Sequence, residues 1–284
     1  MMTRWLIERA GVQITVRAKS DAAKKLVEVA LQGMRPERIS KAQGIKLTVS
    51  GDQDEWRLQD HSNDVKRKIG NSGDLIYHLT DRVVFHVADK VSSKHCLHAA
   101  AVSFNSNALV IPANSGAGKS SFTTWLVANG FDYITDELIL MDDAFGIDGI
   151  ARPIQIKSPG MAAIEHLLVK KEPAEGAAYY PGKLANAVPI TSLGGQISDV
   201  VDHQMKLMIF PHFNKSAEFE FKKLSSGEAG MRLMANFVNA RKLEGHGFKA
   251  MMKMIRQTQC YSLDYSGFNR LPQDFAQQIK DLLQ

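Results

Sequence analysis

The chain has 284 residues, of which 44% are hydrophobic and 23% are charged, and its formal net charge is +5. This balance is typical of a globular protein with a substantial core, and it excludes collagen-like and low-complexity chains. The sequence has no run of about 18 apolar residues, so no membrane-spanning helix is predicted.

The N-terminal residues and the cysteines indicate where the protein works. Arg4, Glu8 and Arg9 interrupt the apolar N-terminal stretch, which therefore does not resemble a signal peptide. Cys96 and Cys260 are the only cysteines, too few for a disulfide framework or a cysteine-rich metal site. We therefore expect a cytoplasmic protein that has reduced thiols and does not bind membranes.

Residues 1–92 are expected to form a small α+β domain. Hydrophobic periodicity predicts a strand, a helix, two strands and a second helix, over residues 12–16, 21–31, 45–49, 55–58 and 74–91. Asp21 is the expected N-cap of the first helix, and Gly51-Asp52 is the expected turn between the paired strands. These residues carry no recognisable chemistry, so a recognition role, an oligomerisation role and a purely structural role stay open.

Residues 93–284 are expected to form a second domain, which is organised around a glycine-rich loop. The apolar run 108–111 predicts a buried strand, and residues 121–129 predict a short helix. Between them lies Ala113-Asn114-Ser115-Gly116-Ala117-Gly118-Lys119-Ser120. A strand, a glycine-rich loop and Lys-Ser at the start of a helix form the context of a P-loop. The alternative is an ordinary glycine-rich turn.

This loop predicts that the chain binds ATP together with Mg²⁺. Glycines let the backbone approach a phosphate closely, and N–H groups at the start of the helix point toward its negative charge. Lys119 is expected to reach the β- and γ-phosphates, and the Ser120 hydroxyl to coordinate Mg²⁺. Ala113 stands where the strict pattern has Gly, which is tolerated if φ is not positive there. The predicted nucleotide-binding residues are Asn114, Ser115, Gly116, Ala117, Gly118, Lys119, Ser120 and Ser121.

Two adjacent carboxylates, Asp136 and Glu137, follow the strand predicted at 131–135. Burying two carboxylates is costly unless something neutralises them, and Mg²⁺ bound to a nucleotide would do so. P-loop enzymes use an acidic residue from a neighbouring strand to hold Mg²⁺, and kinases use a carboxylate to orient the acceptor hydroxyl and take its proton. We interpret the pair as dividing these tasks. The alternative is an acidic turn exposed to solvent.

Two further features are weak signals when taken alone. His98 precedes the loop's strand among small apolar residues, where a histidine is more often a packing residue than a catalytic one. Arg152 and Lys157 flank the segment Pro153-Ile154-Gln155-Ile156. Cations of this kind can stabilise the charge that develops on a transferred phosphoryl group.

The rest of the second domain is expected to mix loops, strands and helices. Residues 159–202 are predicted to be loop-rich, and Ser225 with Glu228 predicts a capping box. Further strands are expected at 206–210, at 218–224 and near Tyr261, and helices at 227–242, 246–258 and 273–283.

Residues 203–256 contain ten Lys or Arg against four Glu. This excess of positive charge is either a solvated helical surface or a site for an acidic or phosphate-bearing partner. No nucleic-acid-binding signature occurs, so nucleic acid is not an expected partner.

The order of these features resembles the catalytic domain of the HPr kinase/phosphorylase family, and is most similar to its HPr-kinase-related branch. His98 matches the family's catalytic histidine, Ser115–Ser120 its SGxGKS loop, and Asp136-Glu137 its pair of acids. The segment Arg152–Lys157 is similar to that of the related branch. The resemblance covers roughly residues 95–265 and is strongest in its first part.

The resemblance implies a role for each matching residue. Asp136 would be the base that acts on the acceptor hydroxyl, Glu137 and Ser120 would attend Mg²⁺, and His98 would support the attacking or leaving oxygen. Ser121 stands where the bifunctional enzymes have glutamate, and the segment associated with phosphorolysis is not found. These departures favour kinase activity over a dual kinase/phosphorylase role, and the resemblance suggests an oligomeric assembly like that of its relatives.

The sequence thus predicts an α/β protein that has a P-loop nucleotide-binding core of the HPr kinase/phosphoenolpyruvate carboxykinase-like type and a small α+β N-terminal domain. We expect an ATP-dependent kinase that transfers the γ-phosphoryl group to a hydroxyl, on a serine of a peptide or protein. Two alternatives stay open: a P-loop NTPase switch that hydrolyses ATP or GTP, and a nucleotide-sensing binding module. The predicted catalytic residues are His98, Lys119, Asp136, Glu137 and Arg152, and the predicted metal ligands are Ser120 and Glu137.

Overall fold

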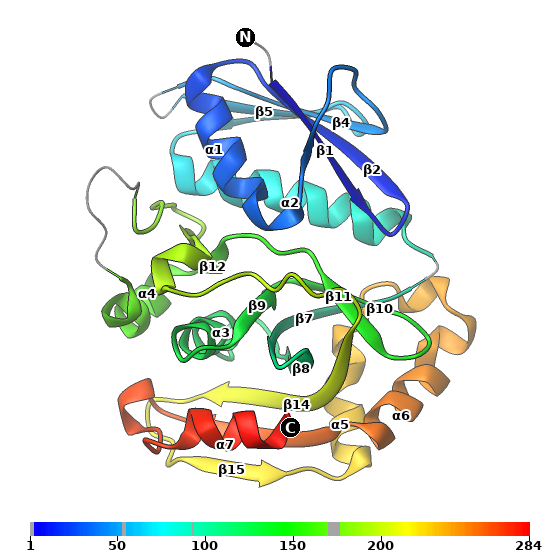
Figure 1. Ribbon diagram of the computed structural model, residues 1–284, viewed down its shortest axis with the longest axis vertical. Coiled ribbons are helices and arrows are strands. Elements are labelled where there is room, and N and C mark those ends of the chain that lie inside the picture. The colour runs from blue at the N-terminus through cyan, green and yellow to red at the C-terminus, as the bar shows by residue number, and fades with distance from the viewer. Residues whose placement is uncertain (1–2, 53–54, 93, 170–176) are drawn as a thin grey trace. The chain divides into compact units, whose positions relative to one another are not determined.

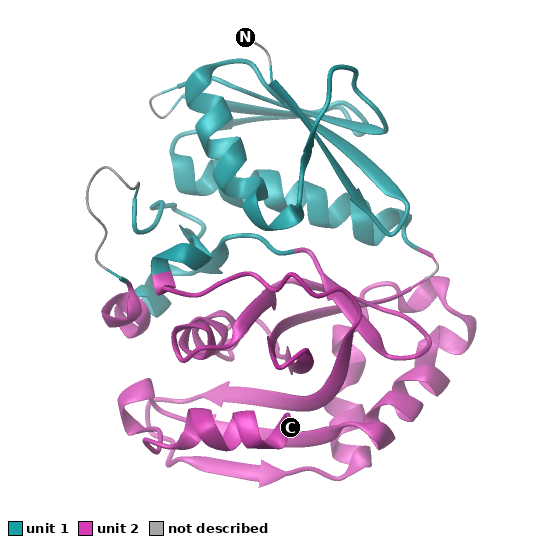
Figure 2. Cartoon of the chain, in the orientation of Figure 1, with its two compact units in different colours: residues 1–91, 151–161, 169–192 teal, residues 92–150, 162–168, 193–284 magenta. Residues whose placement is uncertain are grey.

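A computed structural model describes residues 3–52, 55–92, 94–169 and 177–284. The chain forms two compact units, shown in Figure 2. Unit 1 contains Met1–Val91, Ala151–Met161 and Val169–Ser192, and unit 2 contains Ser92–Ile150, Ala162–Leu168 and Leu193–Gln284. The chain therefore leaves unit 1 near residue 92 and returns to it in two later segments. The division into domains at 92/93 stays a prediction.

Unit 1 is built on a six-stranded sheet with the strand order β3-β1-β2-β4-β5-β6. The strands are β1 (Thr3–Arg9), β2 (Val12–Ala18), β3 (Glu37–Arg38), β4 (Ile45–Ser50), β5 (Trp56–Asp60) and β6 (Val65–Ile69). Strands β2 and β4 run parallel, and all other neighbours in this sheet run antiparallel. A parallel pair needs a crossover connection, and the helix that follows β2 lies in this connection.

Two helices, α1 (Asp21–Leu31) and α2 (Ser72–Lys90), cover one face of this sheet (Figure 1). Helix α1 begins at the expected residue, but its N-cap is Ser20 rather than Asp21. The Ser20 backbone is extended, at φ −137°, and its hydroxyl accepts the Ala23 N–H at 3.1 Å. An N-cap residue lies outside the helical conformation, whereas Asp21 is already the first helical residue.

The stretch 159–202 contains more regular structure than its weak periodicity predicts. It includes most of α4 (Ser158–Ile164) and a strand, β13 (Asn186–Val188), which pairs with β12 (Ile154–Ile156). These elements are too short for a hydrophobic period to reveal them. Residues 170–176 of this stretch lie outside the described residues.

Unit 2 contains an eight-stranded mixed sheet with the order β11-β10-β7-β8-β14-β16-β15, to which β9 adds by pairing with β7. Its strands are β7 (His95–Phe104), β8 (Asn107–Pro112), β9 (Asp132–Thr135), β10 (Leu138–Met141), β11 (Gly146–Gly149), β14 (His203–Phe213), β15 (Glu220–Lys223) and β16 (Gln259–Tyr265). Strands β8, β14 and β16 run parallel, so their carboxyl ends lie at the same edge of the sheet. The protein is thus a mixed α/β protein with several sheets.

Among the described residues, four α-helices lie wholly in unit 2: α3 (Lys119–Ala128), α5 (Ser226–Leu233), α6 (Phe248–Gln257) and α7 (Phe275–Leu282). The capping box of Ser225 and Glu228 is confirmed at the start of α5. The helix predicted over 227–242 is too long, because α5 ends at Leu233 and short 3₁₀ turns follow it. Phe237 leaves the helical conformation, at φ −76° and ψ 106°, so no helix continues to residue 242. Gly245 and His246 both have φ +54°, a left-handed conformation, so the next helix begins only at Phe248.

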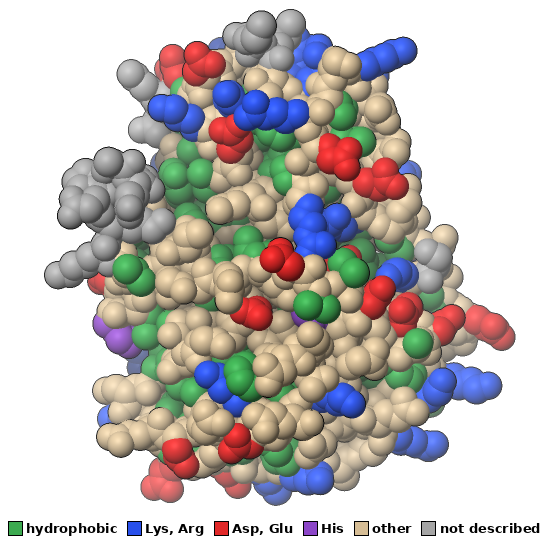
Figure 3. Space-filling model, viewed as in Figure 1, with side chains coloured by type: hydrophobic (Ala, Val, Ile, Leu, Met, Phe, Trp, Pro, Cys, Tyr) green, Lys and Arg blue, Asp and Glu red, His purple; other side chains and the backbone are tan. Residues whose placement is uncertain are grey.

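Helices α5 and α6 pack on one face of the unit 2 sheet and form a core with β7, β8 and β14. Its buried residues include Leu97, Ala99, Val110, Met208, Phe210, Ala229, Leu233, Met251, Met254 and Ile255. Among the described residues, no helix combines the length and the apolar character needed to cross a bilayer. Acidic and basic side chains are interspersed over the face that Figure 3 shows.

Candidate functional site

The glycine-rich loop connects the carboxyl end of β8 to the start of α3, as the sequence predicts. Gly116 has φ +90° and Gly118 φ +93°, a backbone region that glycine enters without a steric penalty. The Ala117 N–H donates to the Asn114 carbonyl at 3.1 Å, and the Ala117 carbonyl accepts the Phe213 N–H at 3.1 Å. The loop is therefore anchored to the end of β14. Ala113 does not have a positive φ, so alanine fits there.

The two loop glycines have different surroundings. A Cβ atom on Gly118 would lie 2.5 Å from the Tyr265 hydroxyl oxygen, whereas a Cβ atom on Gly116 would meet nothing within 4 Å. Gly118 is thus required by close packing, and the backbone at Gly116 borders open space. An anion could approach the loop there, next to the first turn of α3, whose N–H groups have no acceptor within the helix.

Lys119, the first residue of α3, connects the loop to the acid pair. Its side chain is buried, at 9% exposure, and its ammonium group donates to the backbone carbonyl of Asp136. This contact joins two motifs that lie apart in the sequence. The ammonium group therefore lies between the loop and the end of β9, where it can neutralise an anion held by the loop.

The acid pair lies in a packed junction between β9 and β10. Asp136 is 1% exposed, and the Tyr133 hydroxyl donates to its carboxylate at 3.2 Å. The Thr135 hydroxyl donates to the Ile150 carbonyl at 3.0 Å and accepts the Glu137 N–H at 3.2 Å. Asp136 is therefore part of the interior of unit 2, and it is not in a solvated acidic turn.

His98 lies beside the second acid. Its Nε2 atom is 3.4 Å from Glu137 Oε1, and the two side chains are 40% and 30% exposed. The pairing of β7 with β10 places His98 opposite Leu138, the residue after Glu137. The His98 carbonyl accepts a hydrogen bond from the Asn236 side chain at 2.8 Å. Tertiary structure thus joins Lys119 to Asp136 and His98 to Glu137, and the roles of these residues stay predictions.

Arg152 belongs to unit 1, whereas the residues above belong to unit 2. Its side chain is buried, at 4% exposure. The preceding residue, Ala151, packs closely against Gly33. A Cβ atom at residue 33 would lie 2.6 Å from the Ala151 Cβ. A role for Arg152 in the site stays a prediction.

The side-chain oxygens of Ser120 and Glu137 would suit a Mg²⁺ ion that a bound nucleotide brings, and their role as metal ligands stays a prediction. Ser120 and Glu137 offer hydroxyl and carboxylate oxygens, the hard ligands that Mg²⁺ prefers. Over the ranges that the structure describes, no group of three His, Cys, Asp or Glu side chains converges to hold a metal ion. Mg²⁺ commonly keeps waters and takes one or two protein ligands plus substrate phosphates, and this donor set fits that pattern.

A histidine–carboxylate pair near the loop was not predicted from the sequence. His212 Nδ1 lies 2.7 Å from Asp264 Oδ1, and these residues face each other across β14 and β16. Both are one residue before the strand ends, Phe213 and Tyr265, that contact the loop. The signal that could have located them is the shared carboxyl edge of parallel strands, which requires knowledge of strand order.

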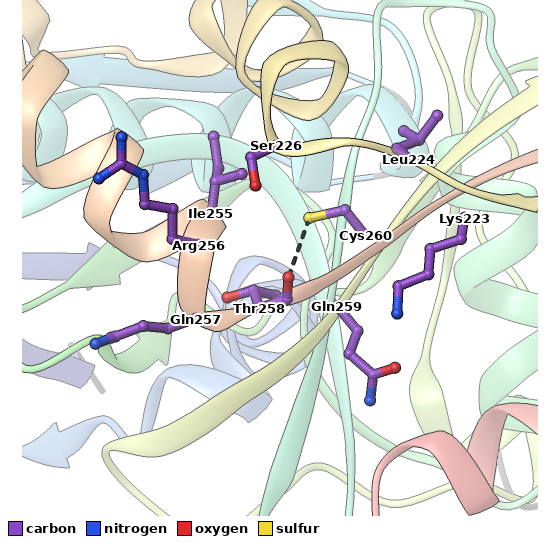
Figure 4. Close-up of a pocket in the computed structure, with 9 residues that line it drawn as sticks. All are labelled: Lys223, Leu224, Ser226, Ile255, Arg256, Gln257, Thr258, Gln259 and Cys260. Carbon is purple, nitrogen blue, oxygen red and sulfur yellow. Dashed lines mark hydrogen bonds between the residues drawn. The ribbon is translucent and has the colours of Figure 1, made fainter.

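A separate pocket of about 270 Å³ lies where β16 begins (Figure 4). Its lining residues are Lys223, Leu224, Ser226, Ile255, Arg256, Gln257, Thr258, Gln259 and Cys260. The loop contacts the other end of β16, at Tyr265, so this pocket is not part of the candidate site. Burial raises the pKa of the Cys260 thiol to about 11, which keeps this sulfur a neutral, poor nucleophile at neutral pH.

Comparisons with known proteins add little to this geometry. No family model matches the chain, and no curated protein matches its sequence. A solved structure of the Hpr(Ser) kinase/phosphatase from Coxiella burnetii is similar over 66% of this chain and 92% of that chain, at 11% identity and a TM-score of 0.28. A TM-score this low does not establish that the two chains share a fold.

Proposed function

We propose that the protein is an ATP-dependent kinase that transfers the γ-phosphoryl group to a hydroxyl, on a serine of a peptide or protein. The observation that carries this proposal is the contact of the Lys119 ammonium group with the Asp136 carbonyl. Lys119 directly follows the loop, whose glycines Gly116 and Gly118 have positive φ. A phosphate-binding loop, a lysine and a carboxylate pair are the parts that phosphoryl transfer requires.

The loop and α3 would hold the donor. Backbone N–H groups around Gly116 would bind phosphate oxygens, and Lys119 would neutralise the β- and γ-phosphates. Ser120 and Glu137 would share the Mg²⁺ ion that the nucleotide brings. Catalysis would then depend on positioning and on electrostatic stabilisation of the transferring group.

The acid pair and His98 would act on the acceptor. As the acceptor oxygen attacks the γ-phosphorus, its bond to phosphorus forms, the bond to the leaving ADP oxygen breaks, and the acceptor proton passes to a carboxylate. We assign that proton to Asp136. Asp136 is 1% exposed, whereas the side chains of His98 and Glu137 are 40% and 30% exposed, so we propose that the acceptor approaches from their side and that His98 would hold its oxygen.

Transfer of label from [γ-³²P]ATP tests this function. The purified protein with Mg²⁺ and a library of serine-containing peptides should label the peptides, and Lys119→Ala should abolish labelling, whereas the exposed control Lys249→Ala should not. Asp136→Asn should lower the transfer rate about 10²- to 10⁴-fold, the usual contribution of a general base. Glu137→Gln should instead raise the Mg²⁺ concentration needed for half-maximal rate.

Other results of the labelling experiment would favour a different function. Label released only as free phosphate would make water the acceptor and favour an NTPase switch. Nucleotide binding with no turnover would favour a sensing module. If Asp136→Asn and Glu137→Gln had equal, mild effects, the division of roles within the acid pair would be wrong.

A further inference from the structure

Helices α1 and α2 cover one face of the unit 1 sheet (Figure 1), and the opposite face presents a set of side chains of its own. Successive side chains on a strand point to opposite faces. Asp60 contacts Arg82 and His86 of α2, which assigns the helix-covered face of β5 to Trp56, Leu58 and Asp60. Arg57 and Gln59 therefore belong to the other face, the open face.

The strand pairings extend this open face across the sheet. One row runs over five neighbouring strands and consists of Arg4, Arg17, Thr48, Gln59 and Lys66. A second row consists of Ser50, Arg57 and Lys68. In a third, Thr15 faces Lys46. These rows place cations from separate strands beside one another.

The half of the open face over β4, β5 and β6 is basic and exposed. We define the basic face as Lys46, Arg57, Lys66 and Lys68 together with Thr48, Ser50 and Gln59 between them. All four cations are exposed, and none of the seven residues is acidic or aromatic. The described loops beside it contain the exposed acids Asp52 and Glu55, between β4 and β5, and Asp64, which lies 3.5 Å from Lys66 in a solvent-exposed pair.

The other half of the open face differs in charge and cover. On β1, β2 and β3, the cations Arg4 and Arg17 are balanced by Glu8 and Glu37. Gln43 crosses over β2, where its backbone bonds to the Thr15 hydroxyl at 2.6 and 2.8 Å. Positive charge is thus concentrated on the β4–β6 half.

Protection of a sheet edge does not account for the basic face. Lysines on an edge strand discourage pairing with another chain, and this explains Lys66 and Lys68 of β6. Lys46 and Arg57, however, lie on β4 and β5, which have hydrogen-bonded neighbours on both sides. Like charges on neighbouring strands repel one another, so such an arrangement suits a partner that supplies the opposite charge.

The geometry favours a protein partner over nucleic acid. Neighbouring strands lie about 4.8 Å apart, and side chains on one face repeat about every 6.8 Å along a strand, the spacing that alternate residues of an extended peptide also have. Proteins that bind single-stranded nucleic acid on a sheet stack the bases on aromatic side chains. The basic face offers cations and the neutral groups of Ser50 and Gln59, but no Phe, Tyr or Trp, and the His61 imidazole beside it is bonded to the buried Thr48 hydroxyl at 2.9 Å.

We propose that the basic face of unit 1 binds an extended, acidic segment of a partner protein. Carboxylates of the segment would meet Lys46, Arg57 and Lys68, and the Ser50 hydroxyl and the Gln59 amide between them would bind its backbone. The inference does not depend on the proposed kinase activity, because it uses no residue of the candidate site.

Fluorescence anisotropy with a labelled peptide of alternating Glu and Ser tests the proposal on the full chain. The triple variant Lys46→Gln, Arg57→Gln, Lys68→Gln should bind about tenfold more weakly than the wild type, as loss of three exposed ion pairs implies. The affinity of the wild type should fall as salt rises. A charge-conserving variant, Lys46→Arg, Arg57→Lys, Lys68→Arg, should bind like the wild type.

The matched control removes the same charge elsewhere, through Lys25→Gln, Lys90→Gln and Lys249→Gln at exposed positions. It should change the affinity by less than about twofold. An equal loss in this control would show that only net charge matters and would overturn the proposal. So would unchanged binding by the triple variant, or tighter binding of single-stranded oligothymidylate than of the acidic peptide through the same three residues.

Discussion

At the scale of single residues, the two loop glycines differ in what an added methyl group would meet. Alanine at either position must adopt a positive φ, which costs about 1–2 kcal/mol. At residue 118 the methyl group would also lie 2.5 Å from the Tyr265 hydroxyl oxygen, whereas at residue 116 it meets open space. The same substitution therefore has one cause of instability at Gly116 and two at Gly118.

We expect Gly118→Ala to lower the free energy of unfolding by at least about 1 kcal/mol more than Gly116→Ala, since displacing a buried side chain has a cost of that order. Urea denaturation of both variants measures the difference. In the Gly118→Ala background, Tyr265→Phe should recover part of the loss, with Tyr265→Phe alone as control. Equal losses at the two glycines would contradict the packing at Gly118.

At the scale of elements, a buried charge network joins β5 to α2. Asp60 Oδ2 accepts hydrogen bonds from Arg82 Nε and Nη2 at 3.0 and 2.7 Å, and His86 Nε2 lies 2.7 Å from it. Burial by itself raises the pKa of Asp60, but hydrogen bonds with His86, Arg82 and the Ser62 N–H outweigh burial, so the pKa lies below its ordinary value. The ionised carboxylate therefore stabilises unit 1.

This network predicts a dependence of stability on pH. Because the folded-state pKa of Asp60 is lowered, its stabilisation is present above the unfolded-state value of about 4 and is lost as pH falls through the folded-state value. Asp60→Asn should reduce the free energy of unfolding by about 3–5 kcal/mol at neutral pH, since it leaves a buried cation without its carboxylate. The deficit should shrink below about pH 4.

Denaturant unfolding across this pH range measures the effect, with Asp64→Asn as control. Asp64 is 86% exposed in its ion pair with Lys66, so its removal should cost less than about 1 kcal/mol. A deficit for Asp60→Asn that is no larger than that of the control, or one that does not change with pH, would contradict the assigned role.

At the scale of the whole molecule, the proposed nucleotide site predicts a thermal shift. A ligand that binds only the folded state stabilises it by about 2.7 kcal/mol at 100 times its Kd, which for a protein of this size raises Tm by roughly 5–10 °C. Mg·ATP should therefore raise the Tm of the wild type, and Lys119→Ala should lose most of this shift. Lys249→Ala should keep it. No shift in the wild type, or the same shift in Lys119→Ala, would count against nucleotide binding.

The sequence by itself determined the features that depend on near neighbours. The loop from Ala113 to Ser120 was visible because its glycines, the apolar strand before it and the Lys-Ser pair lie within a few residues. The capping box of Ser225 and Glu228 was visible for the same reason, since three residues separate its two side chains. Local hydrogen bonding and steric limits on φ act over such distances, so composition and spacing can reveal them.

Only the tertiary structure decided which distant residues meet. The Lys119–Asp136 contact, the approach of Tyr265 to Gly118 and the pairing of His212 with Asp264 all require the order of strands in the unit 2 sheet. The basic face likewise exists only because strand register places Arg57 beside Lys68. Strand order and register depend on burial and hydrogen bonding summed over the whole fold, and no local pattern in the chain contains that sum.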